Sequence, residues 1–492
     1  MIGAIMKLSI RLNAIFKILL TTFNIIIPIF VGPYVIRMLS RTSYDTFSKA
    51  SVEIQLFLTL ATLGFYTYGI RSISKIRQDK QACKRLFSEL LLVEIIANVF
   101  FFLMYLLYIM FINNHQGEVI YFILMIQFLG SSVSVEWMHE ALEDYRFITF
   151  KSIAVKVLYI VLILLFVKGD DITIYGMIIS FTFVLDNVLS FVYILFKRGV
   201  TLRGLQFKKH FKPLLLIFLI TNISLLYTHA DKMMLGLLLS DSAVATYNIP
   251  SYIVTSIYNI IISIFIVAIP RLNEYLTNKQ KDDYLTLYNE LVQTFCLIFI
   301  PLLVFTFIFS DDIIILYAAN KYNDSIIPLK AFTIVIFLNA LVYLQREGVC
   351  YLHEKEKRII TYNLIGGLFN VSSNLLLYFL GLFNPLTAII TLGISFLIVN
   401  VLLRIYIYRK IDSKIILINK NIIFYFLSSL VIVGIDYLFS IAISNLIIRL
   451  MVTFGSAVIV YLLILVIIRD KIIFTNIKVY LGKLRRLKNS LK

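Results

Sequence analysis

The sequence predicts an all-α membrane protein that crosses the bilayer many times. Of its 492 residues, 60% are hydrophobic and 15% are charged, whereas soluble domains carry about 25% charged residues. Apolar runs near the roughly 20 residues that a helix needs to cross a bilayer recur along the whole chain. The loops between these runs are too short to hold a second domain.

Counting these runs predicts about fourteen membrane-spanning helices. They cover approximately 12–36, 46–70, 87–111, 118–137, 148–167, 172–196, 211–230, 243–269, 291–309, 328–351, 359–380, 386–408, 421–441 and 447–468. The first run resembles a signal peptide because Lys7 and Arg11 precede it. It is long, contains Lys17 and lacks a small-residue cleavage site, so we expect it to remain as a helix.

Positive charge alternates between loops. Lys and Arg concentrate in the loops after the second, sixth, eighth and tenth runs and in the C-terminal tail, whereas "NNHQGE", "KGDD" and "GLFNP" together hold one lysine. The positive-inside rule places both termini and the basic loops in the cytoplasm. The formal net charge of +18 therefore reflects membrane topology, and we expect no nucleic acid partner.

A sequence segment that precedes a predicted membrane span occurs twice, which indicates an internal duplication. "RFITFK" at Arg146–Lys151 returns as "RIITYN" at Arg358–Asn363, and a glycine in the next short loop follows each at the same interval. We expect an N-terminal lobe of six helices at 1–200 and a parallel C-terminal lobe of six at 201–410. Two additional helices would fill 411–468, and 469–492 would form a basic cytoplasmic tail. Parallel repeats related by an axis along the membrane normal are a transporter architecture.

Several motifs resemble polysaccharide-transporter flippases. "IPIFVGPYVIRMLS" resembles the "PY-x-x-R" end of their first helix, and "YGIRSISKIRQDK" their "YG-x-R-x-I" signature. "EALEDYRFITFKSIAVKVL" is similar to their "GLEDF" segment, and "ADKMMLG" and "IPRLNEY" to their "LDK-x-MLG" and "PR" signatures. The motifs cover 1–280 densely. The chain thus resembles Wzx-type flippases of the multidrug/oligosaccharidyl-lipid/polysaccharide (MOP) exporter superfamily.

This resemblance implies a two-lobed transporter in a bacterial plasma membrane. Its cargo would be an undecaprenyl-diphosphate-linked oligosaccharide repeat unit, moved from the inner to the outer leaflet by alternating access for capsule or O-antigen synthesis. Polysaccharide polymerase machinery would be a partner. One departure is "SVSVEWMHEALEDY", where the family often has two aromatics at Met138 and His139 and a glycine at Ala141.

Embedded cations suit such a cargo, because a diphosphate crossing hydrocarbon needs positive charge to offset its desolvation. Lys17 and Lys156 lie within predicted spans, and Arg37 lies near a span end. We expect these three to bind diphosphate. Arg71 and Arg271 occupy matching inner ends of the two repeats and are candidate gate residues. The alternative for each is that its side chain reaches out to lipid headgroups.

Embedded acids form a second candidate group. Glu53, Glu94 and Asp186 interrupt apolar helices of the first lobe. A carboxylate there could bind Na⁺ or take up a proton to drive exchange. It could instead neutralise Lys17 or Lys156 in a buried ion pair. The sequence favours neither ion over the other.

Polar side chains of the central helices could contact sugar. Asn222 and Tyr252 are candidates for hydrogen bonds to glycan hydroxyls, and the alternative is a hydrogen bond between helices. The three cysteines lie far apart without CxxC spacing, so we expect neither metal nor disulfide chemistry and no cofactor beyond a coupling ion.

Enzymatic function fits the sequence poorly. The chain has no Walker A motif, and its longest predicted outward loop, around 310–327, contains neither His nor Arg. A membrane glycan polymerase or ligase would carry catalytic residues on a larger loop. A cation-coupled multidrug exporter of the same fold remains an alternative, although the lysines in the first and fifth helices favour an anionic cargo.

Overall fold

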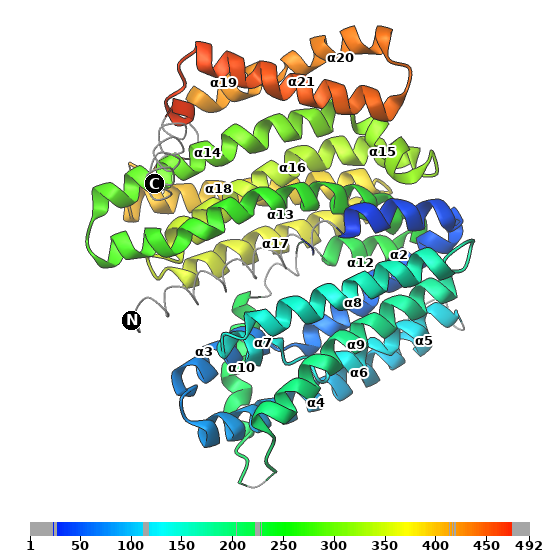
Figure 1. Cartoon of the computed structure of the whole chain (residues 1–492), viewed down its shortest axis with the longest axis vertical. Coiled ribbons are helices and arrows are strands. Elements are labelled where there is room, and N and C mark those ends of the chain that lie inside the picture. The colour runs from blue at the N-terminus through cyan, green and yellow to red at the C-terminus, as the bar shows by residue number, and fades with distance from the viewer. Residues whose placement is uncertain are drawn as a thin grey trace, which may run out of the picture. The chain divides into compact units, whose positions relative to one another are not determined.

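A computed structural model describes residues 23, 27–111, 118–202, 204–221, 227, 229–412, 414–415, 417 and 420–474. Their regular structure is helical throughout, without a strand in these ranges (Figure 1). The predicted all-α class is confirmed. Packing divides the chain into two compact units. One comprises Met1–Asn248 and Gly367–Ala388, and the other Ile249–Gly366 and Ile389–Lys492.

The first unit is built around helices of the N-terminal half. After a short helix at Ile27–Met38 come α2 (Arg41–Ala61), α3 (Phe65–Ile76), α4 (Lys80–Phe111), α5 (Val119–Met125), α6 (Gln127–Ser131), α7 (Glu136–Ala141), α8 (Tyr145–Phe166), α9 (Ile172–Arg198), α10 (Lys208–Thr221) and α12 (Ala230–Leu238). Helix α8 packs along α9, α3 against α7, and α2 against both α4 and α12. The neighbouring α8 and α9 are visible in Figure 1.

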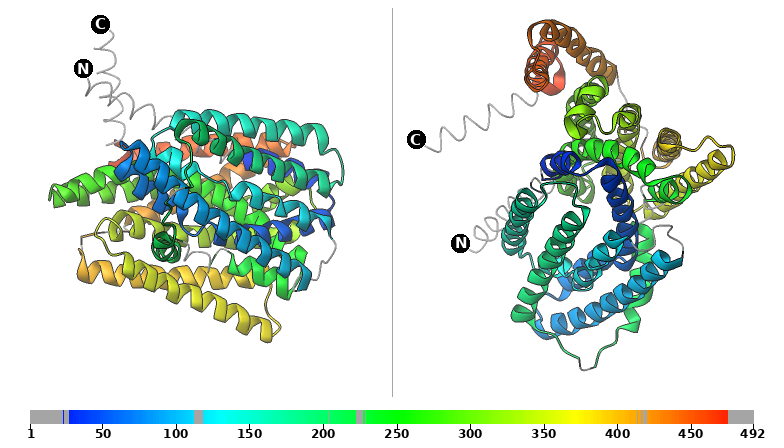
Figure 2. Two further views of the ribbon diagram at one scale, coloured as in Figure 1. Left: turned by 90° about the horizontal axis from the view of Figure 1, so that it is seen from below. Right: turned by 90° about the vertical axis from the view of Figure 1, so that its right-hand side faces the viewer.

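The second unit holds the later helices. α13 (Asp241–Thr277) begins in the first unit and continues here. There follow α14 (Lys281–Ile308), α15 (Ser310–Ala318), η1 (Asn323–Ser325), α16 (Ile326–Gln345), η2 (Arg346–Cys350), α17 (Glu356–Phe379), α18 (Pro385–Lys410), α19 (Lys420–Ser429), α20 (Val431–Ala442) and α21 (Leu446–Ile467). Of these, α17 from Gly367 onward and α18 up to Ala388 belong to the first unit. Helices α19, α20 and α21, orange to red in Figure 2, pack as one layer against α14. They correspond to the two additional predicted helices.

The predicted span 46–70 is two helices rather than one. A turn at Thr62–Gly64 separates α2 from α3, and Leu63 and Gly64 both have positive φ, of 39° and 75°. Glycine fits this turn for two reasons. It takes positive φ without a steric penalty, and a Cβ there would lie 2.9 Å from the backbone nitrogen of Phe218.

Ten helical segments in the described residues are long and apolar enough to cross a membrane. The multi-pass prediction is confirmed, but the count of fourteen is not. The span 12–36 falls largely outside the described residues, and 46–70 is divided. Helix α17 carries three buried asparagines, Asn363, Asn370 and Asn374, which lower its hydropathy. The boundaries of the predicted lobes, 1–200 and 201–410, stay a prediction.

All three cysteines are buried. Cys83 lies on α4, Cys296 on α14 and Cys350 at the end of η2, each with a free thiol and no exposed surface. Cys83 donates from Sγ to the carbonyl of Ile76 at 3.2 Å, whereas Cys296 sits among the apolar residues of its helix. These thiols behave as small core residues.

Candidate functional site

A cluster of lysines and carboxylates lies where α7, α8 and α9 meet in the first unit. Its position depends on Trp137 of α7, which is 2% exposed and packs 5.9 Å from the Phe87 ring, centre to centre. Gly69 of α3 makes room for the indole, since a Cβ there would lie 2.3 Å from the ring atom Cε3. This packing fixes α7, and with it Glu136 and Glu140, against the neighbouring helices.

Lys151 of α8 is at the centre of this acid–lysine cluster. Its Nζ donates to Oδ2 of Asp186 at 2.7 Å, to the Asp186 carbonyl at 3.1 Å and to Oγ of Ser190 at 2.9 Å. These acceptors engage all three donors of the ammonium. The Lys151 side chain is 4% exposed and that of Asp186 is 30% exposed. Lys151 therefore joins α8 to α9 through an internal ion pair.

Lys156 lies further along α8 and is half-buried. Asp186, Glu136 and Lys151 all act on it electrostatically. Lys156 thus belongs to a mixed group of two lysines and two carboxylates, as expected for charges at membrane depth. Oδ1 of Asp186 is buried and accepts no hydrogen bond from the part of the chain that the structure describes.

Glu140 extends this cluster toward α3. The side chains of Tyr66 and Tyr145 both hydrogen-bond to it. Sequence reasoning missed Lys151, Glu136 and Glu140, although all three lie within or beside the quoted "EALEDYRFITFK" segment. Their clustering depends on how three helices meet, which spacing along one helix does not reveal.

Asp186 was predicted either to couple an ion or to pair with Lys17 or Lys156. It forms an ion pair with Lys151 and also acts electrostatically on Lys156, and its role in ion coupling stays a prediction. Lys17 lies outside the described residues. The other two candidate acids are buried among aromatic donors of the first unit. Glu53 is 1% exposed and lies close to Tyr108, and Glu94 faces the indole of Trp137. Their role in ion coupling stays a prediction.

A further buried carboxylate, which sequence reasoning also missed, lies on α12. Asp231 has no exposed surface. It accepts from the hydroxyl of Tyr247 on α13 at 2.9 Å and from Nδ2 of Asn374 on α17 at 2.7 Å, and Asn370 hydrogen-bonds to it as well. Asp231 was visible in the quoted "ADKMMLG" motif, but its partners come from distant parts of the sequence.

The remaining predicted residues that the structure describes lie at surfaces. Arg37, Arg71 and Arg271 are exposed. Arg271 donates to the Tyr275 hydroxyl from Nη2 at 2.9 Å and lies over that ring, an anchoring contact within its own helix. Tyr252 is 39% exposed. Asn222 falls outside the described residues. The gate and glycan roles stay predictions.

Comparison with known proteins places the chain in a family. Residues 10–276 match the model of the family described as "Polysaccharide biosynthesis protein". The chain is 22% identical over 277 residues to a "Putative O-antigen transporter" of Escherichia coli (strain K12), covering 55% of this chain and 66% of that protein. A protein of the same description from Shigella dysenteriae is 20% identical over 269 residues, covering 53% and 67%.

Solved structures share the fold at low identity. "Lipid II flippase MurJ, inward closed conformation" matches with a TM-score of 0.72 and 15% identity over 94% of this chain and all of that one. An inward-facing multidrug resistance MATE transporter of the MOP superfamily matches at 0.56 and 12% identity, over 78% of this chain and 98% of that one. The relatives are transporters and flippases rather than enzymes. The predicted resemblance to Wzx-type flippases is confirmed, and the chain belongs to the polysaccharide biosynthesis protein family, with the fold of the MOP exporters.

Proposed function

We propose that this protein flips undecaprenyl-diphosphate-linked oligosaccharide repeat units from the inner to the outer leaflet of a bacterial plasma membrane, for synthesis of capsule or O-antigen. The description of two relatives as putative O-antigen transporters and the fold that the chain shares with a lipid II flippase support this proposal. The positive-inside pattern supports cytoplasmic termini. Released repeat units would pass to a polysaccharide polymerase.

The acid–lysine cluster is the observation that carries the proposal. A diphosphate must be partly stripped of water on its path, and a nearby ammonium offsets that cost. Asp186 and Ser190 accept hydrogen bonds from all three donors of Lys151, so we assign Lys151 the structural role of holding α8 against α9. We assign the half-buried Lys156 to the diphosphate. Oδ1 of Asp186 would accept a hydrogen bond from a sugar hydroxyl.

Alternating access would be coupled to a cation, either Na⁺ or H⁺. Asp231 is the carboxylate that we assign to coupling, ahead of Glu53, Glu94 and Asp186. It is fully buried, and its contacts through Tyr247, Asn374 and Asn370 are with neutral donors on two other helices. Binding a cation there would change how these donors are arranged and so favour one conformation.

The test is to delete the gene and quantify lipid-linked repeat units on each membrane face. Complementation would use wild type, Lys156→Ala and Lys168→Ala. Lys168 is an exposed lysine just beyond the end of α8 and removes the same charge outside the cluster. We expect complete repeat units to accumulate on the cytoplasmic face after deletion, with rescue by wild type and Lys168→Ala but not by Lys156→Ala.

The other possible results of this complementation test would each lead to a different conclusion. Rescue by Lys156→Ala to the wild-type level would keep the cargo and remove Lys156 from its path. Units gathering unpolymerised on the outer face would indicate a polymerase. An unchanged glycan would contradict the flippase and favour the drug exporter of the same fold.

A further inference from the structure

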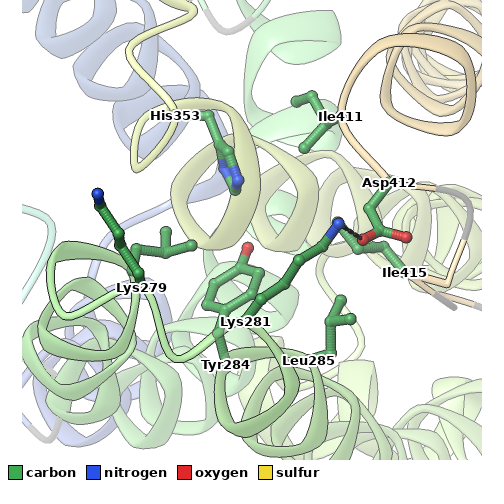
Figure 3. Close-up of a pocket in the computed structure, with 9 residues that line it drawn as sticks. Lys279, Lys281, Tyr284, Leu285, His353, Ile411, Asp412 and Ile415 are labelled. Carbon is green, nitrogen blue, oxygen red and sulfur yellow. Dashed lines mark ion pairs between the residues drawn. The ribbon is translucent and has the colours of Figure 1, made fainter.

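A pocket of about 380 Å³ lies in the second unit, where four helix ends come together (Figure 3). It is formed by the turn between α13 and α14, the segment before α17 and the segment after α18. Its volume is within the roughly 300–1,000 Å³ typical of small-molecule sites. The charge pattern of the sequence predicts that all three segments face the cytoplasm.

Two lysines supply the positive charge of this pocket. Lys281 Nζ lies 2.7 Å from Oδ2 of Asp412, and its side chain is 67% exposed whereas that of Asp412 is 9% exposed. Figure 3 shows Lys279 on the opposite side, with Tyr284 and His353 between. Lys279 has a φ of 57°, a backbone conformation in which glycine is the common residue. Two ammonium groups against one carboxylate leave the pocket basic.

The close contact with the Lys281 ammonium lowers the pKa of the Asp412 carboxyl. Asp412 is therefore ionised at neutral pH. Because the Lys281 side chain is itself largely exposed, the ion pair that holds it has a small net energy. An incoming dianion competes for Lys281 with a single carboxylate. The pair positions the ammonium without blocking its use.

The aromatic groups between the lysines have defined donor roles. Tyr284 donates its hydroxyl proton to the carbonyl of Gly348 at 2.8 Å. Nδ1 of His353 lies 2.8 Å from the carbonyl of Val349. Because a carbonyl only accepts, Nδ1 carries a proton, and in the neutral ring Nε2 is an acceptor. The His353 and Tyr284 rings meet edge to face, with centres 5.7 Å apart.

Aliphatic side chains complete the wall. Leu276 and Leu285 come from either side of the α13–α14 turn, and Ile411 and Ile415 come from the segment after α18. Ile415 is fully buried. A basic rim beside an apolar wall is complementary to a molecule that joins an anionic group to an apolar one.

We propose that this pocket binds a phosphate ester bearing an apolar group, with the phosphate between Lys279 and Lys281 and the apolar part against Leu285 and Ile415. The phosphate would come from a phospholipid headgroup of the adjacent leaflet or from a soluble phosphorylated metabolite. Nε2 of His353 would accept a hydrogen bond from a ligand hydroxyl. The site lies in a single unit and does not depend on which cargo the protein moves.

The test uses the purified full-length protein in nanodiscs. One arm compares phosphatidylcholine discs with discs that also contain phosphatidylglycerol and measures co-purifying phosphatidylglycerol by native mass spectrometry. The other arm adds geranyl phosphate to phosphatidylcholine discs and measures binding by calorimetry. The variant is Lys279→Ala/Lys281→Ala. The matched control is Lys355→Ala/Lys357→Ala, which removes two exposed lysines of the neighbouring segment that do not line the pocket.

We expect binding of one probe to weaken about tenfold in the pocket variant and to stay unchanged in the control. Loss confined to phosphatidylglycerol identifies the lipid source, and loss confined to geranyl phosphate identifies the soluble one. Equal loss in variant and control, or no binding of either probe to wild type, overturns the proposal. Ile415→Trp fills the apolar side and leaves every charge in place, so it should weaken the same probe. Unchanged binding by this variant would equally contradict the site.

Discussion

The ammonium of Lys49 on α2 lies 3.2 Å from Oδ1 of Asp241 at the start of α13, and the two side chains are 7% and 15% exposed. The pair joins segments almost two hundred residues apart. Nearby, Nδ2 of Asn248 donates to Oγ of Ser48 at 2.8 Å. Both contacts lie within the first unit and fix α2 to the beginning of α13.

Removing one member of this pair should cost more than removing both charges. Lys49→Met leaves a shielded Asp241 carboxylate, and we expect the free energy of unfolding to fall by about 2 kcal/mol. Lys49→Met/Asp241→Asn should recover much of that loss. Thermal unfolding in detergent, followed by the fluorescence of the single tryptophan, measures both. Equal losses in the single and double variants would show that the two charges are not coupled.

Substitutions of the two lysines in the acid–lysine cluster should have different effects, one mainly on stability and the other mainly on transport. Lys151→Met removes a 4%-exposed ammonium from Asp186 and Ser190, so we expect about 2–3 kcal/mol of destabilisation. Lys156→Met should lower the unfolding temperature less than Lys151→Met does, because Lys156 is only half-buried, and should abolish rescue of the glycan. Parallel measurement of unfolding and of repeat-unit export distinguishes them. Similar profiles for both variants would contradict the division of roles.

Gly69 should not tolerate a methyl group. An added Cβ would lie 2.3 Å from the Trp137 ring, which would displace α7, so we expect Gly69→Ala to destabilise the protein by about 2 kcal/mol. Gly434 on α20 is the control, because no atom lies within 4 Å of its added Cβ. Gly434→Ala should leave stability unchanged or raise it slightly. Thermal unfolding measures both variants. Equal unfolding temperatures for Gly69→Ala and Gly434→Ala would contradict the close packing of Gly69 against Trp137.

Asp231→Asn should uncouple transport from its driving ion. The amide keeps the side-chain shape but removes the negative charge that a cation needs. We expect transport in reconstituted vesicles to lose its dependence on an imposed Na⁺ or H⁺ gradient, while the protein remains folded. The Asp436→Asn variant, which changes an acid on α20, is the control and should retain the dependence. A gradient response in Asp231→Asn equal to that of wild type would remove Asp231 from coupling.

The helices were predictable because each long apolar run can be recognised from its own length and composition, without knowledge of the rest of the fold. The runs 172–196 and 447–468 coincide closely with α9 (Ile172–Arg198) and α21 (Leu446–Ile467). The break at Leu63–Gly64 was missed, because the apolar composition continues across the turn and only the positive φ of two successive residues reveals it.

The candidate site was predictable only in part. Lys156 and Asp186 stand out because each interrupts an apolar helix. Lys151 and Glu136 lie near helix ends, where charges are common, so nothing local separates them from surface residues. Their importance comes from packing between α7, α8 and α9, and the same holds for Asp231 with Asn374, which is 143 positions away. Such pairings depend on tertiary structure rather than on sequence spacing.

The burial of Cys83, Cys296 and Cys350 has a practical consequence for membrane sidedness. A thiolate must form and be reached before a maleimide can react, and none of these sulfurs has exposed surface. The wild-type chain is therefore already a background of low reactivity for a membrane-impermeant thiol reagent. A cysteine introduced at exposed Lys168, and another at exposed Lys355, would then report directly which side of the bilayer each loop faces, without first replacing the native cysteines.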